Sequence, residues 1–288
     1  MKKWVFIMFI IALLWISNKG LLPSSEHDGK AREQEQTTMK DTLKGEDTVI
    51  NIAADQVYQG DLLLVNKKYP IRENSMRSDI VYLFGQEDLV QGYGLLNAEI
   101  QLSESIALQF NKMVRAAGVD GAQHFLISSG YRDFAEQNLL YEEKGSDYAL
   151  PAGYSEHNLG LSLDIGSTEG EMSKAPEGKW LQKKAWKYGF ILRYPKDKTA
   201  ITGIQYEPWH FRYVGMPHSA IMQEHNFTLE EYLDFLKESL SILTVVEGKE
   251  YTVSYYPISK DKKIEIPSDH QYEISGNNID GVIVTTYK

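Results

Sequence analysis

An alternation of apolar and polar side chains at positions 161–165 constrains the fold of this chain more than any other feature. Three aliphatic residues in this run are separated by Ser162 and Asp164, which predicts a strand with one buried and one polar face. His157 lies in the turn-rich loop just before the strand. We therefore expect a sheet on which the side chains of His157 and Asp164 point at one position.

Hydrophobic periodicity along the chain predicts an α+β fold, in which a small antiparallel sheet with flanking helices precedes a C-terminal β appendix. Helices are predicted where apolar residues recur at helical spacing near capping residues, at Ser103–Ala117, Asp133–Lys144, Lys179–Tyr188, Ser219–Glu224 and Leu229–Leu240. Strands are predicted at short apolar or alternating runs, at Leu62–Val65, Phe125–Ile127, Leu161–Ile165, Phe190–Tyr194 and Trp209–Val214. The appendix contains five short β runs separated by turn residues, Ile242–Val246, Tyr251–Tyr256, Lys263–Ile266, Tyr272–Ile274 and Val282–Thr286.

The chain divides into four segments by composition. Residues 1–22 are predicted to be a membrane anchor or signal segment, because two lysines precede an uninterrupted apolar run at 4–16. Extended through residue 22, this run nearly reaches the length of a membrane span, and the lysines before it place the rest of the chain outside. A cleaved signal is the alternative. Residues 23–55 are polar enough to predict a flexible tether, residues 56–240 form the domain with the polar motifs, and residues 241–288 form the β-rich appendix.

Charge and cysteine content exclude several classes of function. The net charge of -10 argues against nucleic acid as a partner, since a polyanion requires a basic face. The chain has no cysteine, which excludes thiolate metal sites, disulfide frameworks and a lipidated cysteine. Any bound metal must therefore be held by His, Asp or Glu.

A second motif, Glu207-Pro208-Trp209-His210, supplies the groups that the first motif lacks. Two imidazoles and one carboxylate, from His157, His210 and Asp164, suit one zinc ion and leave a coordination position free for water. Glu207 is the natural proton acceptor because it lies three residues before His210. For Trp209 we favour a core aromatic role, holding the ligand strand in place, over contact with a substrate.

The two motifs resemble those of the D-Ala-D-Ala zinc metallopeptidases, a group that also holds lysostaphin-type enzymes and the hedgehog domain. The resemblance is strongest to the VanY-type D,D-carboxypeptidases of glycopeptide resistance. It extends over nearly the whole chain and includes the segments 59–66, 129–134, 177–180, 188–195 and 273–281.

The resemblance implies a role for each site residue. His157, Asp164 and His210 would bind one Zn²⁺, Glu207 would be the base, and Arg132 would face the substrate carbonyl and its developing negative charge. Ser155 and Gln137 occupy positions that the family uses near the substrate, although a helix-capping hydroxyl and a solvent-facing amide are equally compatible with the sequence. Ser162 departs from the family pattern, because many relatives carry alanine there.

The implied activity is zinc-dependent removal of the C-terminal D-alanine from peptidoglycan pentapeptide precursors. It would take place on the extracytoplasmic side of the cell membrane, with residues 4–22 as a single-pass anchor, and would contribute to vancomycin resistance. Two alternatives stay open. One is another peptidoglycan peptidase, namely an L,D-carboxypeptidase, a D,D-dipeptidase or an endopeptidase. The other is a non-catalytic zinc-containing cell-wall-binding module, which the presence of both Glu207 and Arg132 disfavours.

Overall fold

The computed structural model describes residues 47–145 and 149–288. The predicted anchor at 1–22 and most of the predicted tether lie outside these residues. Within the two described ranges, no helix combines the length and hydropathy that crossing a membrane requires.

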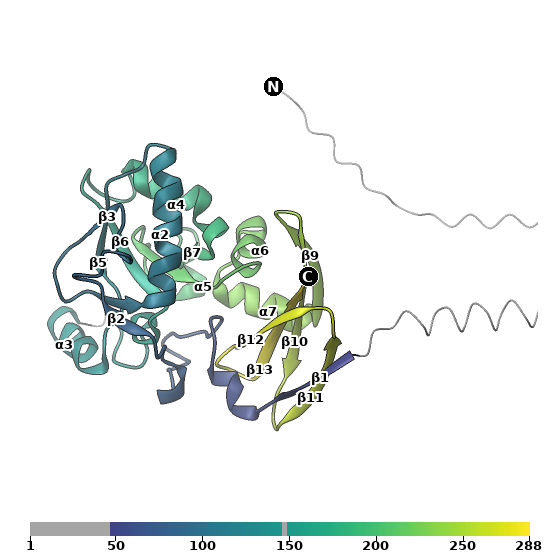
Figure 1. Ribbon diagram of the computed structural model, residues 1–288. Coiled ribbons are helices and arrows are strands. Elements are labelled where there is room, and N and C mark those ends of the chain that lie inside the picture. Colours follow the sequence, from purple (N-terminus) through teal and green to yellow (C-terminus); the bar gives the residue numbers. More distant parts are fainter. Residues whose placement is uncertain (1–46, 146–148) are drawn as a thin grey trace, which may run out of the picture. The chain divides into compact units, whose positions relative to one another are not determined.

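In the described residues, helices and strands are mixed up to α7, and only strands follow it (Figure 1). The helices are α2 (Glu104–Val119), α3 (Phe134–Lys144), α4 (Pro176–Lys184), α5 (Thr199–Thr202), α6 (His218–His225) and α7 (Leu229–Ser239), with 3-10 turns η1 (Ala54–Tyr58), η2 (Glu73–Ser75), η3 (Glu156–Leu159) and η4 (Ala185–Tyr188). The strands before α7 are β1 (Asp47–Ile52), β2 (Ile80–Tyr82), β3 (Tyr93–Leu95), β4 (Gln101–Ser103), β5 (Phe125–Ser129), β6 (Ser162–Ser167), β7 (Phe190–Leu192) and β8 (His210–Tyr213). Those after it are β9 (Ser241–Val246), β10 (Lys249–Pro257), β11 (Lys262–Pro267), β12 (Gln271–Gly276) and β13 (Gly281–Tyr287).

A five-stranded sheet in the order β3-β5-β6-β8-β7 carries the polar motifs. Its central pairs are antiparallel, while β3 and β5 run parallel at one edge. Helix α2 packs its apolar stripe on this sheet, and the two together form the main core. The members of this core include Ile106, Phe110, Met113, Val114, Phe125, Ile127, Leu163, Ile165, Phe190 and Phe211.

Local capping explains where the two helices near the motifs begin. The hydroxyl of Ser103 accepts a hydrogen bond from the amide of Ile106 at the start of α2, and Asp133 forms a reciprocal capping box with Glu136 at the start of α3. Both arrangements satisfy amides that a helix leaves without partners in its first turn. Helix α3 ends at Gly145, whose φ of 74° favours glycine.

The C-terminal residues 241–288 form a second, antiparallel sheet in the order β12-β13-β10-β9. This sheet belongs to the same compact unit as the rest of the described chain. Apolar residues of α6, α7, β10 and β13 bury one another in a shared cluster. Leu62 and Leu64, which come before β2 in the chain, belong to the same cluster. Burial of this surface stabilises the appendix, which is too small to be secure alone.

The predicted α+β fold, with a small sheet, flanking helices and a β-rich C-terminal part, is confirmed. The sheet differs from the prediction because it is mixed rather than wholly antiparallel. The predicted tether through residue 55 also extends too far. Residues Asp47–Ile52 form β1, which pairs antiparallel with β11 and buries Ile50 and Ile52 against it.

The predicted strand Leu62–Val65 is wrong, although all four of its residues are buried. No strand of residues 47–145 or 149–288 pairs with it, and its backbone groups bond to other partners. The amide of Leu62 donates to Ser275 Oγ at 2.8 Å, and the carbonyl of Leu64 accepts from Asn278 Nδ2 at 2.9 Å. Gly60, just before the segment, has a φ of 105° and packs so closely on Ser275 that a Cβ would lie 2.5 Å from Ser275 Oγ. Residues 275–278, at the end of β12 and in the turn after it, therefore hold this segment, and no sheet is needed.

Candidate metal centre

His157 is held by the loop that precedes β6. Ser155 caps the 3-10 turn η3 by accepting a hydrogen bond from the amide of His157 at 3.3 Å, and Gly160 ends the turn with a φ of 80°. The imidazole Nδ1 lies 2.6 Å from the carbonyl oxygen of Gly130. Because a carbonyl only accepts, Nδ1 carries the proton and Nε2 is left with a free lone pair.

Asp164 and His210 are direct cross-strand neighbours. They pair in the antiparallel register of β6 and β8, and directly opposite residues project from the same face of a sheet. His210 Nδ1 lies 3.2 Å from Asp164 Oδ1, and His157 Nε2 lies 3.5 Å from Asp164 Oδ2. The two imidazole rings are perpendicular, with centroids 4.9 Å apart.

The three side chains fit a divalent metal ion. One potential ligand atom from each of His157, Asp164 and His210 lies within 4.8 Å of the other two. Asp164 Oδ1 is buried and has no hydrogen-bond partner among the described residues, although such groups are normally paired. A cation bound between the three side chains would satisfy this oxygen, and two nitrogens with one carboxylate form a donor set that zinc prefers.

The charges of the cluster favour an ionised carboxylate. Burial alone would raise the pKa of Asp164, but the neighbouring imidazoles hold it well below its usual value. Burial and the charge of Arg132 lower the pKa of His157. For His210, burial would lower the pKa, but the nearby carboxylates of Asp164 and Glu156 outweigh it and raise the pKa to about 9. In the absence of a metal, the surrounding carboxylates therefore favour the protonated, positively charged form of the His210 imidazole.

Glu207 stands at the edge of this cluster. It begins a tight turn that is closed by a hydrogen bond from the amide of His210 to the Glu207 carbonyl at 3.2 Å, and its own amide bonds to the carbonyl of Tyr194. One carboxylate oxygen lies 3.6 Å from His210 Nδ1. Burial raises the pKa of Glu207, which makes it a better proton acceptor than an exposed carboxylate.

Arg132 is fixed by Ser129 at the end of β5 and by Gln137 of α3. Its Nε donates to Gln137 Oε1 at 2.9 Å and its Nη1 donates to Ser129 Oγ at 2.7 Å. Gln137 is buried and its Nε2 donates to the carbonyl of Leu150 at 2.6 Å, so both ends of its amide have protein partners. The interpretation of Gln137 as a solvent-facing amide is therefore wrong, because the residue holds the guanidinium of Arg132.

A cavity of about 690 Å³ contains the side chains of His157, Asp164 and His210, which together are called the metal cluster below. The other residues that line the cavity include Arg132, Ser155, Glu207 and Trp209. Ser155 lines this cavity while its hydroxyl also caps η3, so the capping role is confirmed and contact with a substrate stays a prediction. Trp209 is 42% exposed at the cavity. The favoured interpretation of Trp209 as a core residue is wrong, since the strand is held by its backbone pairing and the indole is left at the rim.

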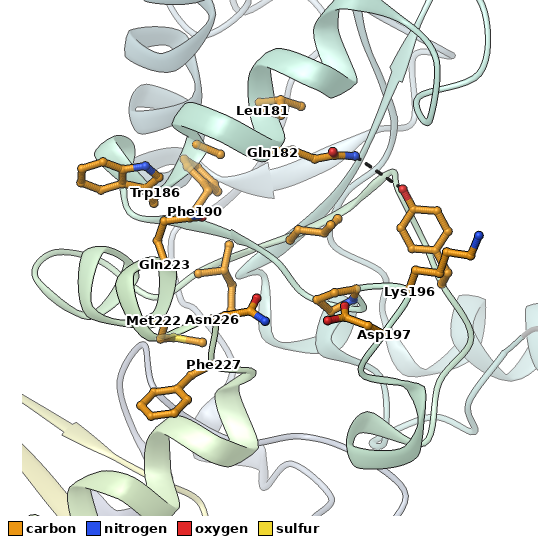
Figure 2. A pocket seen from close by; sticks show the side chains of 15 residues that line it. Leu181, Gln182, Trp186, Phe190, Lys196, Asp197, Met222, Gln223, Asn226 and Phe227 are labelled. Atoms are coloured by element: carbon orange, nitrogen blue, oxygen red, sulfur yellow. Dashed lines mark hydrogen bonds between the residues drawn. The ribbon is translucent and has the colours of Figure 1, made fainter. Parts of the chain in front are cut away.

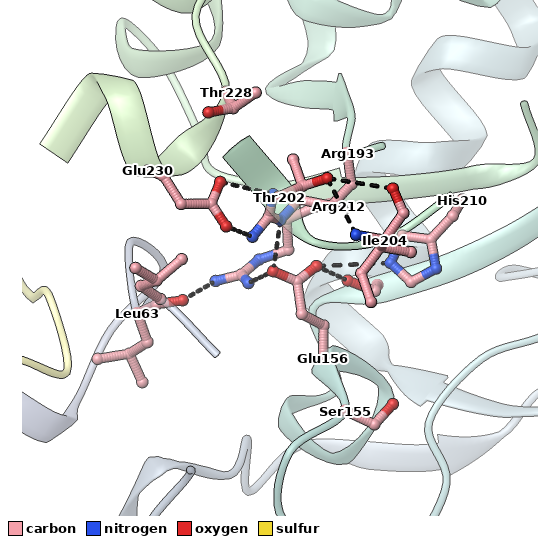
Figure 3. Close-up of polar contacts among 12 residues, drawn as sticks. Leu63, Ser155, Glu156, Arg193, Thr202, Ile204, His210, Arg212, Thr228 and Glu230 are labelled. Carbon is pink, nitrogen blue, oxygen red and sulfur yellow. Dashed lines mark hydrogen bonds and ion pairs between the residues drawn. The ribbon is translucent and has the colours of Figure 1, made fainter. Parts of the chain in front are cut away.

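A buried ion network lies directly behind His210 (Figure 3). Glu156 is fully buried, and its Oε1 accepts hydrogen bonds from Arg193 Nε and Arg212 Nη1, both at 2.8 Å. Its Oε2 lies 3.4 Å from His210 Nε2 and accepts from Ser162 Oγ at 3.0 Å. Burial alone would raise the pKa of Glu156, but the two guanidinium groups hold it well below its usual value.

The network extends to two distant parts of the chain. Arg193 forms a two-pronged ion pair with Glu230 of α7, with distances of 2.8 and 2.9 Å. Arg212 Nη2 donates to the carbonyls of Asp61 and Leu63 at 2.9 and 3.0 Å. Arg193, Arg212 and Glu230 have no role that the sequence motifs predict. The available signal was a pair of arginines within otherwise apolar predicted strands, which have to be paired if they are buried.

A second cavity, of about 320 Å³, is formed by residues of α4, η4, β7 and α6 (Figure 2). It shares Tyr206 with the larger cavity, and Gln182 Nε2 contacts the hydroxyl of that tyrosine at 3.5 Å. Asp197 is its one carboxylate, and no histidine lines it. It therefore lacks the donors for a metal ion, and the larger cavity is the candidate site.

Comparisons with known proteins agree on one family. The D-alanyl-D-alanine carboxypeptidase (VanY) family matches residues 99–216, a range that contains all four converging side chains. A D-alanyl-D-alanine carboxypeptidase from Enterococcus faecium is 52% identical over 296 residues, which cover 100% of this chain and 97% of that protein. The vancomycin resistance D,D-dipeptidase VanXYg, solved with a D-Ala-D-Ala phosphinate analogue, is 33% identical with a TM-score of 0.73 and covers 85% of this chain and 100% of its own. A mutant VanY D,D-pentapeptidase from a VanB-type resistance cassette, solved with Zn(II), is 29% identical with a TM-score of 0.51 and covers 60% and 98%.

Proposed function

The chain belongs to the D-alanyl-D-alanine carboxypeptidase (VanY) family, and we propose that it is a zinc enzyme that removes the terminal D-alanine from peptidoglycan precursors ending in D-Ala-D-Ala. One observation carries this proposal. The potential ligand atoms of His157, Asp164 and His210 converge, and a carboxylate oxygen of Glu207 lies 3.6 Å from the imidazole of His210. Shortening the precursor in this way removes the D-Ala-D-Ala end, which supports a role in vancomycin resistance.

His157, Asp164 and His210 would hold the zinc ion through Nε2, the carboxylate and Nδ1. When bound there, zinc supplies Lewis acidity, which polarises the scissile carbonyl and makes a water molecule acidic near neutral pH. The orphaned Asp164 Oδ1 and the two ring nitrogens that face the Asp164 carboxylate are the features of this chain that fit the ion.

Glu207 moves the proton in this reaction. Its half-buried carboxylate accepts a proton from the attacking water and later donates that proton to the amine of the departing D-alanine. The raised pKa of Glu207, which follows from its burial, suits both steps. The transfer needs a carboxylate close to the metal cluster, and Glu207 meets that condition.

Arg132 stabilises the negative charge that develops on the carbonyl oxygen. Its guanidinium is held by Gln137 and Ser129 before any substrate arrives. A donor fixed in advance stabilises the transition state without having to reorganise during the reaction. Arg132 also lines the same cavity as the metal cluster, so it can reach a carbonyl placed there.

The reaction is tested by following D-alanine release from a synthetic pentapeptide that ends in D-Ala-D-Ala, with the metal content of the protein measured in parallel. Free D-Ala-D-Ala, a tetrapeptide with an L,D bond and cross-linked muropeptides complete the substrate panel. We expect the pentapeptide to be the best substrate and zinc to be required. A preference for free dipeptide would instead indicate a D,D-dipeptidase, and zinc binding without any turnover would indicate a wall-binding module.

The Glu207→Gln variant isolates the proton-transfer role, because the amide keeps the shape of the side chain but cannot accept a proton. Turnover should fall by about 10²- to 10⁴-fold, while zinc content stays at the wild-type level. Glu171→Gln is the control, since Glu171 is exposed and pairs with Lys174 away from the cavity. Turnover by Glu207→Gln at the rate of the control would refute Glu207 as the base.

We propose further that residues 4–22 anchor the protein in the cell membrane with the zinc domain outside. The support is the apolar run that follows Lys2 and Lys3. Protease added to intact protoplasts should degrade the zinc domain, and alkaline carbonate should leave the protein in the membrane fraction. A domain protected from the protease would contradict the orientation, and release by carbonate would contradict the anchor.

A further inference from the structure

The ring of His210 has two polar neighbourhoods, one on each nitrogen. Nδ1 faces Asp164 and Glu207, at 3.2 and 3.6 Å, on the side of the metal cluster. Nε2, on the other side of the ring, faces the buried Glu156 Oε2 at 3.4 Å. A neutral imidazole carries a proton on one nitrogen only, so the partner of Nε2 decides which nitrogen is free to bind a metal.

Apart from His210, the described hydrogen-bond partners of the Glu156 carboxylate are all donors. Arg193 and Arg212 donate to Oε1, and Ser162 donates to Oε2 beside His210 (Figure 3). These contacts leave the carboxylate no freedom to turn away from the imidazole. The carboxylate can therefore only accept from Nε2, and acceptance requires that Nε2 carries the proton.

We propose that Glu156 is a positioning residue for the metal centre: it accepts the Nε2–H of His210 and thereby leaves Nδ1 as the metal-binding atom. This inference rests on the proposed zinc enzyme and adds a residue that works through His210 without touching the substrate. The two imidazoles then bind through opposite nitrogens, because Gly130 holds the proton on Nδ1 of His157. Outer partners of this kind orient the ligand and strengthen its basicity.

The arginines make Glu156 suitable for this role. A lone buried carboxylate would be costly to keep charged, but Arg193 and Arg212 compensate its charge, and Glu230 compensates the excess positive charge of Arg193. Arg212 is itself tied to the carbonyls of Asp61 and Leu63. The orientation of one metal ligand therefore depends on α7 and on the buried segment that starts near Asp61.

Glu156→Gln tests the proposal because an amide offers one acceptor where the carboxylate offers two. If the amide oxygen stays with the arginines, the NH₂ group faces His210 Nε2 and favours the proton on Nδ1, where it blocks the metal. We expect zinc affinity, measured by competition with a chelator, to fall by about 10- to 100-fold. The matched control is Glu177→Gln. Glu177 is equally buried, accepts from Ser167 and the amide of His124, and lies outside the metal cavity, so its loss should leave zinc affinity unchanged.

A second measurement needs no substitution. In the ¹⁵N-labelled, zinc-loaded wild-type protein, NMR should show His210 protonated at Nε2 and His157 protonated at Nδ1. A proton on Nδ1 of His210, or a folded Glu156→Gln variant with wild-type zinc affinity, would overturn the proposal. If the variant does not fold, the tautomer of the wild-type protein decides. Failure of the proposed function looks different, because the wild-type protein would then lack zinc or would release no D-alanine.

Discussion

Protonation of His218 should destabilise the folded protein at mildly acidic pH. This histidine begins α6 and is buried between two hydroxyls: Tyr232 Oη lies 2.8 Å from Nδ1 and Thr285 Oγ1 lies 3.2 Å from Nε2. The described structure gives it no carboxylate partner. Burial lowers the pKa of His218 from its ordinary 6.5 to about 3, so the folded state keeps the imidazole neutral where the unfolded chain would protonate it.

The sign and size of the effect follow from linkage. Between about pH 6.5 and pH 3 the unfolded chain binds the proton and the folded chain does not, so stability falls as pH falls. Above about pH 6.5 both states are neutral and the contribution is fully present. Since a tenfold change in proton affinity corresponds to about 1.4 kcal/mol, lowering the pH from about 7 to about 5 should cost roughly 2 kcal/mol through this residue alone.

The assay compares urea unfolding of the wild-type protein and His218→Gln, with chelator present and the pH varied. The glutamine can still bond to both hydroxyls but has no titrating group, so its free energy of unfolding should fall by roughly 2 kcal/mol less than that of the wild type over the same pH interval. His225→Gln, at the exposed end of the same helix, is the control and should follow the wild type. Parallel pH dependences for His218→Gln and wild type would refute the reasoning.

Three further outcomes are expected. Arg132→Lys keeps the positive charge but loses the planar guanidinium that Gln137 and Ser129 hold. Turnover of the pentapeptide should therefore fall by about 10²-fold at unchanged zinc content. Wild-type turnover would contradict the role of Arg132. Asn278→Ala removes the amide that bonds to the carbonyls of Leu64 and Pro70 and should lower the free energy of unfolding in urea by about 1–3 kcal/mol, whereas no change would mean that water replaces the amide. Dialysis against a chelator should abolish turnover and lower the melting temperature, and added zinc should restore both; activity that survives in demonstrably metal-free protein would contradict the zinc dependence.

The elements that the sequence predicted best are those in which apolar residues recur regularly over many positions. Helix α2 begins after the predicted cap Ser103, and its apolar stripe runs from Ile106 to Ala117. Strand β1 was missed because only Ile50 and Ile52 are buried in it, which is too short a pattern to separate from a polar tether. The run Leu62–Val65 failed for another reason. Burial was predicted correctly there, but a short apolar run does not reveal whether another strand is available to pair with it.

The innermost layer of the site was easier to predict than the layer behind it. His157, Asp164 and His210 lie together because two short motifs place them on adjacent strands, and their assignment as zinc ligands stays a proposal. Glu156 meets Arg193 and Arg212 across sequence separations of 37 and 56 residues. A spacing within one motif cannot encode such contacts. Only the fold decides which buried charges become partners.

Because Asp164 pairs with His210 across β6 and β8, metal binding also depends on the register of these two strands. Side chains alternate between the two faces of a sheet at every residue, so sliding β8 past β6 by a single position would turn one of these groups to the opposite side. A misaligned molecule could keep most of its secondary structure and still bind no ion. Metal occupancy of a purified sample would then report the fraction of molecules whose hydrogen-bond ladder closed correctly.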